Sequence, residues 1–145
     1  MEFPIRVEKT WGHEIWFAND PVKNYCGKEL AFRRGWRCSL HMHPIKDEVF
    51  YVTAGLFLIE YGSNPESLKT LQLGMGTQFH VQTGLWHRMT AIGVRGDNGG
   101  YATLIEVSTF HDDNDVVRHT PGGLSPNLEF LPHSPVVASS FPAVC

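Results

Sequence analysis

The stretch GWRCSLHMHPIKDEVFYVTAG, residues 35–55, decides the fold of this chain. It holds His41, His43 and Glu48 at the spacing H-x-H-x4-E, between two glycines. The two histidines are two positions apart, so on a β-strand both imidazoles lie on one face. Glu48 begins the next apolar run, and a hairpin through the polar corner at 44–47 would return its carboxylate to the histidines. Two nitrogens and a carboxylate that converge in this way form half of a metal site.

A further ligand comes from the second glycine-rich segment, where His87 follows Gly84 by three positions. The pattern G-x5-H-x-H-x4-E-x6-G arises by chance about 0.0003 times in a chain of this composition. Three neutral imidazoles and one carboxylate leave open positions on a six-coordinate ion, as in a catalytic site. We therefore predict a divalent metal ion, and Mn, Zn, Fe and Ni all suit this set of donors.

Short apolar runs separated by glycine and proline follow one another along the chain, and no helical periodicity appears. The predicted strands are 11–18, 28–34, 36–43, 48–53, 56–61, 68–73, 77–81, 87–92 and 102–107. Residues 1–10 are expected to be an irregular lead-in or an edge strand, and Ala54-Gly55 is expected to close a tight hairpin. The segments 62–66 and 93–100 are predicted loops. This pattern predicts an all-β antiparallel sandwich or small barrel.

Composition and length indicate one domain, because 145 residues with 42% hydrophobic side chains suffice for one core. The net charge is −3 with scattered Lys and Arg, which argues against a nucleic-acid partner. No apolar run reaches membrane-spanning length, and no signal peptide or disulfide framework is visible, so we predict a cytoplasmic protein. We assign the barrel to residues 1–120. Residues 121–145, with five prolines, are predicted to form an extended tail.

Two charged residues near these segments are candidates for acid–base chemistry. Lys46 lies between His43 and Glu48. It is either a solvated lysine of the corner or a cation at the lip of the metal site that serves a substrate oxygen. Glu106 lies in the apolar segment LIEVS, where burial is costly unless the carboxylate is paired or used. The alternation of the strand does not decide which face Glu106 occupies.

Several other polar and aromatic residues are weaker candidates. Arg88 and Arg118 are phosphate-binding candidates, with salt bridges as the alternative interpretation. His80 and His111 are candidates for the wall of the pocket. Three of the four tryptophans are expected to pack in the core or at its rim, although their faces also suit stacking on sugars; they are Trp11, Trp16 and Trp86.

The two glycine-rich segments resemble the motifs of the cupin family. Gly35, His41, His43, Glu48 and Gly55 match the first motif. The second motif, G-x5-P-x-G-x2-H-x3-N, resembles residues 76–91, with glutamine at 82 in place of proline and alanine at 91 in place of asparagine. The resemblance covers roughly residues 10 to 118. It implies a single-domain, all-β cupin fold, an antiparallel double-stranded β-helix or jelly-roll barrel, with His41, His43, Glu48 and His87 as the metal ligands.

Within the cupins the chain is most similar to sugar isomerases. A lysine between the second histidine and the glutamate is a feature of D-lyxose isomerase-type cupins. These also carry an E-V-S segment followed by paired aspartates, as at 106–108 and 112–113 here. The cupin module of type II mannose-6-phosphate isomerases is similar in its early Trp-Gly, at 11–12, and in an acidic ending like 113–118. The resemblance implies that Lys46 and Glu106 are the acid–base pair.

The function expected from these observations is a metal-dependent aldose–ketose isomerase that acts on a sugar or sugar phosphate through an ene-diolate. Its partner would be a small carbohydrate, with no nucleic acid or membrane and with homodimer formation possible. One alternative is an Fe(II)-dependent cupin dioxygenase, which needs the same four ligands, a mostly apolar pocket and no acid–base pair. Another is a non-catalytic sugar-binding or accessory cupin, which tolerates loss of Lys46 and Glu106.

Overall fold

A computed structural model describes residues 2–94, 100–126 and 136–137 of the chain. The described residues form strands joined by turns and contain no α-helix. The predicted all-β class is therefore confirmed. No helix in this part of the chain has the length and apolar character needed to cross a membrane.

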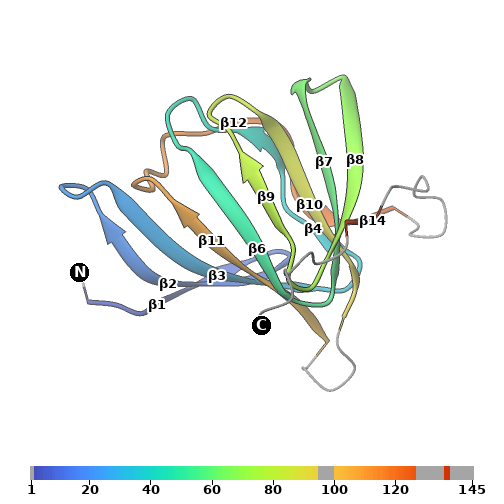
Figure 1. The fold of residues 1–145 in the computed structure, drawn as a ribbon, viewed down its shortest axis with the longest axis horizontal. Coiled ribbons are helices and arrows are strands. Elements are labelled where there is room, and N and C mark those ends of the chain that lie inside the picture. Colours follow the sequence, from blue (N-terminus) through green and yellow to red (C-terminus); the bar gives the residue numbers. More distant parts are fainter. Residues whose placement is uncertain (1, 95–99, 127–135, 138–145) are drawn as a thin grey trace, which may run out of the picture.

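The strands build two sheets that face one another (Figure 1). In chain order they are β1 (Ile5–Lys9), β2 (Gly12–Asp20), β3 (Tyr25–Arg33), β4 (Trp36–Arg37), β5 (Leu40–Met42), β6 (Glu48–Ala54), β7 (Leu56–Asn64), β8 (Ser67–Gly74), β9 (Gln78–Val81), β10 (Trp86–Gly93), β11 (Tyr101–Ser108), β12 (Val117–Thr120), β13 (Gly123–Leu124) and β14 (Val136–Val137).

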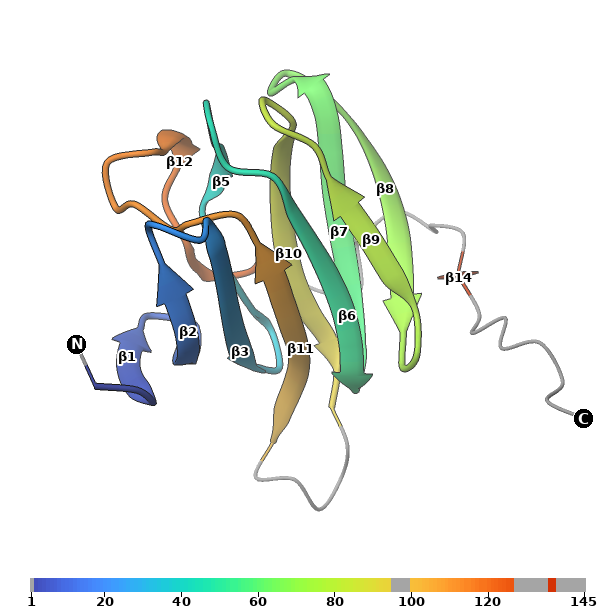
Figure 2. The same ribbon diagram turned by 60° about the vertical axis from the view of Figure 1, so that its left-hand side comes forward.

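One sheet has the order β1-β2-β3-β11-β6-β9, and the other has the order β12-β5-β10-β7-β8-β14 (Figure 2). The short strands β4 and β13 extend the second sheet, because β4 pairs with both β10 and β13. All these pairs are antiparallel except β14 with β8. Strands distant in sequence lie side by side, as β3 does with β11 and β5 with β10. This connectivity is that of a jelly roll.

The predicted hairpin at Ala54-Gly55 is wrong. β6 and β7 do not pair; they belong to opposite sheets, and the chain crosses from one sheet to the other at this glycine. Gly55 has a φ of +81°, and a Cβ there would lie 2.6 Å from the carbonyl oxygen of Gly93. A glycine allows both the conformation and the close approach. The expected hairpin between His43 and Glu48 is likewise a crossing, from β5 in one sheet to β6 in the other.

Most other strand predictions differ only at their ends, and one predicted strand is divided. The edge strand expected in residues 1–10 is β1, and the run predicted at 36–43 is broken into β4 and β5 at Cys38. There the amide of Met89 donates to the Cys38 thiol at 3.3 Å, while the Cys38 amide still donates to the carbonyl oxygen of Met89 at 3.2 Å, so one of the two hydrogen bonds at this point is made by a side chain. The predicted loop at 62–66 is shorter, because β7 continues to Asn64.

Part of the C-terminal segment predicted as a tail forms short strands that pair with the second sheet. Its residues 123–124 form β13 and pair with β4, and residues 136–137 form β14. The remaining tail residues, 127–135 and 138–145, lie outside the described part of the chain, as does 95–99 of the predicted loop at 93–100.

The apolar core lies between the two sheets. Phe32, Val52, Phe57 and Leu104 are fully buried there, and Trp11 stacks on Phe32 with 3.9 Å between ring centroids. Removal of each such side chain from water contributes about 1.5–3 kcal/mol. This packing fixes the positions of the strands that carry the polar residues described below.

Gly12 provides a direct test of the close pairing of β2 with β3. A Cβ at Gly12 would lie 1.9 Å from the carbonyl oxygen of Ala31, so Gly12→Ala requires the backbone to shift. We expect this variant to lose about 2 kcal/mol or more of unfolding free energy, measured by denaturant titration. Gly123→Ala is the control, because its Cβ would meet nothing within 4 Å. Equal stability of the two variants would contradict the described pairing.

Candidate functional site

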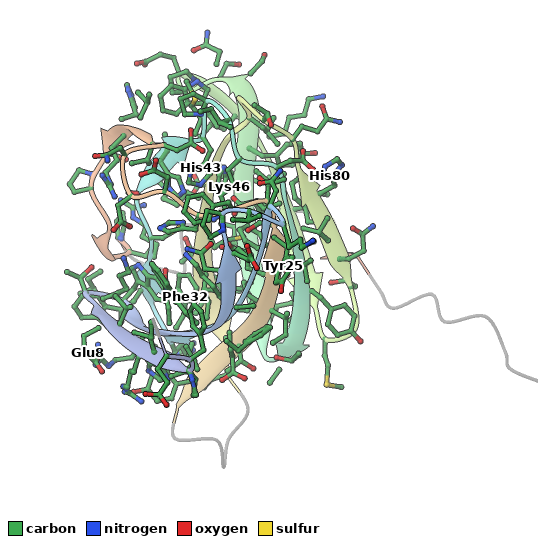
Figure 3. All side chains as sticks on the ribbon, turned by 90° about the vertical axis from the view of Figure 1, so that its left-hand side faces the viewer. Glu8, Tyr25, Phe32, His43, Lys46 and His80 are labelled. Carbon is green, nitrogen blue, oxygen red and sulfur yellow. The ribbon has the colours of Figure 1, made fainter. Side chains whose placement is uncertain are left out.

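A cavity of about 350 Å³ opens between the sheets, and its wall combines the apolar core with a group of buried polar side chains. His41, His43 and His87 line it together with Glu48. Figure 3 shows His43 and Lys46 close together in the upper part of the barrel, with Phe32 lower in the view. The cavity is within the size range of small-molecule sites.

Three imidazoles converge on one point of the cavity. His41 lies on β5 directly opposite His87 on β10, and His43 follows β5 immediately. The ring centroid of His41 is 4.9 Å from that of His43 and 4.4 Å from that of His87. One ligand atom from each of the three lies within 4.8 Å of the others, so the group could hold a metal ion.

Backbone carbonyls fix the orientation of all three rings. The Nδ1 atoms of His41, His43 and His87 hydrogen bond to the carbonyl oxygens of Ser39, Asp115 and Leu85, at 2.8, 2.7 and 2.9 Å. A neutral imidazole that donates from Nδ1 keeps a lone pair on Nε2. Contacts of this kind fix the tautomer and orientation of metal-binding histidines.

Glu48 reaches the histidines from the opposite sheet. Its Oε1 atom lies 3.0 Å from Nε2 of His87 and 3.5 Å from Nε2 of His43. Oε1 of Glu48 and Nε2 of His87 are buried, and neither makes a well-aligned hydrogen bond within the described structure. Unsatisfied buried polar atoms are costly, and a shared cation would satisfy both. The four residues therefore fit a divalent ion.

The protonation states suit metal binding as well. Burial holds the pKa of His41 well below its usual range, and His87 and His43 add to the shift. Burial also lowers the pKa of His43, although Glu48 opposes this. Burial acts to raise the pKa of Glu48, but His87 and Lys46 outweigh it and hold the value well below the usual one. Neutral imidazoles and an ionised carboxylate are the forms that bind metals.

Lys46 and Glu106 form a buried ion pair beside this group. The Nζ atom of Lys46 lies 2.7 Å from Oε2 of Glu106 and 3.2 Å from Oε2 of Glu48. Lys46 also donates to Nδ1 of His111 at 3.3 Å, and Ser108 donates to Glu106 at 3.1 Å. The side chains of Lys46 and Glu106 are only 2% and 6% exposed.

The structure places Glu106 on the inner face of β11. Residues 102, 104, 106 and 108 of this strand are all buried. The pairing of Ser108 with Glu48 in β6 fixes this register. Glu106 and Glu48 therefore face the same cavity, which the alternation of β11 alone did not decide.

Asp115 holds the corner that carries these residues. Its two carboxylate oxygens accept hydrogen bonds from the amides of Ile45 and Lys46, at 2.9 and 2.8 Å. Its carbonyl oxygen accepts the Nδ1 proton of His43. One buried residue thus positions both a candidate metal ligand and a candidate acid–base group. The sequence offers no local signal for this role, because Asp115 lies about seventy residues beyond the corner.

The weaker sequence candidates are divided between the cavity and the outer surface. Arg118 and His111 line the cavity. Arg88 is not a lining residue, and its guanidinium makes two hydrogen bonds to Glu60, at 3.0 and 2.9 Å. His80 lies on β9 and does not line the cavity. Its side chain is 47% exposed and lies 2.9 Å from Asp47. Figure 3 shows His80 at the outer side of the barrel.

Sequence reasoning missed two buried charged residues of the cavity wall, Glu14 and Lys28. Lys28 is 2% exposed, and its Nζ atom lies 3.5 Å from Oε1 of Glu14 and 4.2 Å from the ring centroid of Trp16. The sequence did contain a signal for Lys28. Lys28, Leu30 and Phe32 are two positions apart, so on a strand their side chains lie on the same face. A lysine on the core face of a strand is seldom buried without a partner.

Comparisons with solved structures identify the fold. An oxalate decarboxylase from Bacillus subtilis is 17% identical over 81% of this chain and 32% of its own, with a TM-score of 0.65. KdgF from Halomonas sp. is 20% identical over 70% and 81% of the two chains, with a TM-score of 0.56. CapF, solved with 3-isopropenyl-tropolone, is 16% identical over 84% and 34%, with a TM-score of 0.65.

These structures are cupins, and the likeness confirms the predicted jelly-roll cupin fold. The chain spans about a third of the oxalate decarboxylase and CapF chains. No protein-family model matches the chain, and no curated protein matches it by sequence. At these identities the likeness shows the fold alone.

Metal binding is tested by the effect of an added ion on stability. An ion at a hundred times its Kd stabilises the folded state by about 2.7 kcal/mol. We expect Zn²⁺ or Mn²⁺ to raise the Tm of the metal-free protein, and His41→Ala or His87→Ala to lose both this increase and the bound metal. His80→Ala is the control, since His80 lies outside the cavity. Stoichiometric metal in a His41→Ala/His43→Ala protein would contradict the site.

The role of Asp115 is tested by Asp115→Ala. The substitution removes the carboxylate that accepts from the amides of Ile45 and Lys46 and keeps the carbonyl oxygen that holds His43. The corner between His43 and Glu48 then loses its link to residue 115, so we expect metal affinity to fall by about 10- to 100-fold, measured by competition with a chelator. Asp20→Ala is a matched control, because Asp20 also accepts two backbone amides, from Val22 and Lys23, in an exposed turn. If the two variants change metal affinity equally, Asp115 does not position the site.

Proposed function

We propose that the protein is a metal-dependent aldose–ketose isomerase that acts on an open-chain sugar. The observation that carries the proposal is the buried pair of Glu106 and Lys46, 2.7 Å apart, directly beside the three histidines and Glu48. Proton transfer between two neighbouring carbons requires an acid–base pair next to the proposed metal ligands. The cupin fold supports the proposal, since it places all six residues around one cavity.

The residues that would hold the ion are His41, His43, His87 and Glu48. When bound, a divalent ion supplies Lewis acidity that polarises the oxygens of a bound carbonyl compound. The three rings are held by backbone contacts. They would therefore offer an ion a set of nitrogens whose positions are fixed before it binds.

Glu106 is the proposed base at carbon. It takes the proton from C2 and returns it to C1, so one C–H bond breaks, one forms, and the reaction needs no external oxidant or reductant. Burial and the Glu48 carboxylate raise the pKa of Glu106, whereas Lys46 and Lys28 oppose the rise. A raised pKa makes a carboxylate a better proton acceptor near neutral pH.

Lys46 is the proposed donor at oxygen. Burial acts to lower its pKa, but Glu106 and Glu48 outweigh this, so the pKa is raised and the ammonium stays charged. Lys46 therefore donates a proton to O1 and takes up the proton that O2 releases, so its ammonium is restored at the end of the step. Burial lowers the pKa of the neighbouring His111 to about 4, with Lys28 and Lys46 adding to the effect. His111 is thus neutral and accepts from Lys46.

The alternatives account less well for this cavity. A dioxygenase site of the same four ligands has no need of an acid–base pair, whereas this cavity contains the buried pair Lys46 and Glu106. A non-catalytic cupin has no need of a buried ion pair, whose desolvation costs several kcal/mol per charge. Activity without oxygen distinguishes the isomerase from the dioxygenase, and turnover distinguishes it from a binding module.

The catalytic role of Glu106 is tested by Glu106→Gln, which keeps the shape and removes the base. Exchange of the C2 proton with deuterium from solvent, followed by NMR on a panel of aldoses and ketoses, should fall by about a hundredfold or more. Metal content should be unchanged, because Glu106 is not a proposed ligand. Glu29→Gln is the matched control, since Glu29 lies on the next strand, opposite Ile105 and facing outward.

Wild-type exchange rates in metal-loaded Glu106→Gln would refute this role. If the wild-type protein exchanges no C2 proton of any sugar tested, the sugar-binding cupin becomes the better account.

A further inference from the structure

We infer that Glu14 and Lys28 form a second subsite of the cavity, which binds neighbouring hydroxyl groups of the substrate beyond C2. The inference rests on the proposed function, because it assigns the same cavity to an open-chain sugar. It extends that function by naming what this end of the cavity binds, which is an uncharged polyol segment of the substrate.

The first argument is the set of contacts that these two residues make. Trp16 donates from Nε1 to Oε1 of Glu14 at 2.7 Å, and its ring lies under the ammonium of Lys28. Trp16 does not line the cavity, whereas Glu14 and Lys28 do. Trp16 therefore contacts both charged groups on the side away from the cavity, and the two groups face the cavity.

The second argument is that both groups keep unused hydrogen-bonding capacity. An ammonium has three N–H donors, and a carboxylate accepts at both oxygens. Within the described structure Lys28 makes one long hydrogen bond, at 3.5 Å, and Oε2 of Glu14 accepts none. A buried charge with so few partners is costly, so a bound ligand with polar groups would offset the cost.

The third argument is position relative to the proposed chemistry. Lys28 on β3 lies directly opposite Glu106 on β11. Adjacent strands are about 4.8 Å apart, so a sugar with C2 at Glu106 extends its following carbons over Lys28. His111 connects the two places, because its ring contacts Trp16 at 4.9 Å and its Nδ1 atom accepts from Lys46.

The charges indicate which group binds. A hydroxyl both donates and accepts, so a pair of neighbouring hydroxyls can satisfy an ammonium and a carboxylate together. A phosphate or carboxylate bound to Lys28 would lie beside the negative charge of Glu14 and be repelled. Glu14 stays ionised, because its pKa is lowered: burial acts to raise it, and Lys28 and Lys9 outweigh burial.

The test uses glycerol, erythritol and xylitol, polyols that have no carbonyl group and cannot be isomerised. Binding to the metal-loaded protein is measured by calorimetry. We expect affinity to rise about tenfold or more from glycerol to xylitol, since each added hydroxyl that pairs with a charged group contributes favourably. This rise should vanish in Glu14→Gln/Lys28→Met, which removes both charges together and leaves no unpaired one. Lys69→Met, an exposed site on β8, is the control.

Three results would overturn the inference: no dependence of affinity on chain length in the wild-type protein, the same dependence in the double variant, or tighter binding of xylonate through Lys28. The measurement needs no turnover. If the dependence is seen but no sugar is isomerised, the proposed function fails and the subsite stands. If sugars are isomerised without the dependence, the subsite fails alone.

Discussion

The carboxylate of Glu48 is the group on which the rest of the site depends. It begins β6 in one sheet, whereas the three histidines lie on or beside strands of the other. One of its oxygens lies 3.0 Å from Nε2 of His87, and the other lies 3.2 Å from Nζ of Lys46. A single side chain thus contacts both the histidine group and the ion pair. Without it, the charge of Lys46 and that of a bound ion would lose their nearest common counter-charge.

The barrel tolerates these charges because its apolar part is well packed. Buried ion pairs seldom stabilise a fold, since desolvation offsets most of their attraction. The stacked rings of Trp11 and Phe32 and the fully buried Leu104 provide the favourable burial instead. The strands of this core continue into the polar end, so the same register that packs Leu104 also aims Glu106 at the cavity.

Sequence predicted the parts of this arrangement that depend on local spacing. The all-β class and most strands follow from apolar runs and glycines. The predicted hairpins failed because a turn signal such as Ala54-Gly55 does not say whether the next strand stays in the same sheet. The face of Glu106 and the burial of Lys28 depend on register between strands far apart in sequence. The contacts of Asp115 with the 44–47 corner are equally non-local.

The central claim is that His41, His43, His87 and Glu48 bind one divalent ion in this cavity. Anomalous X-ray diffraction from crystals grown with Mn²⁺ or Zn²⁺ tests it most directly, because the signal locates the metal itself. Our account predicts one strong anomalous peak, within about 2.0–2.3 Å of the three Nε2 atoms and of a Glu48 oxygen. A fully occupied peak elsewhere, or an empty cavity in crystals saturated with either ion, would contradict it.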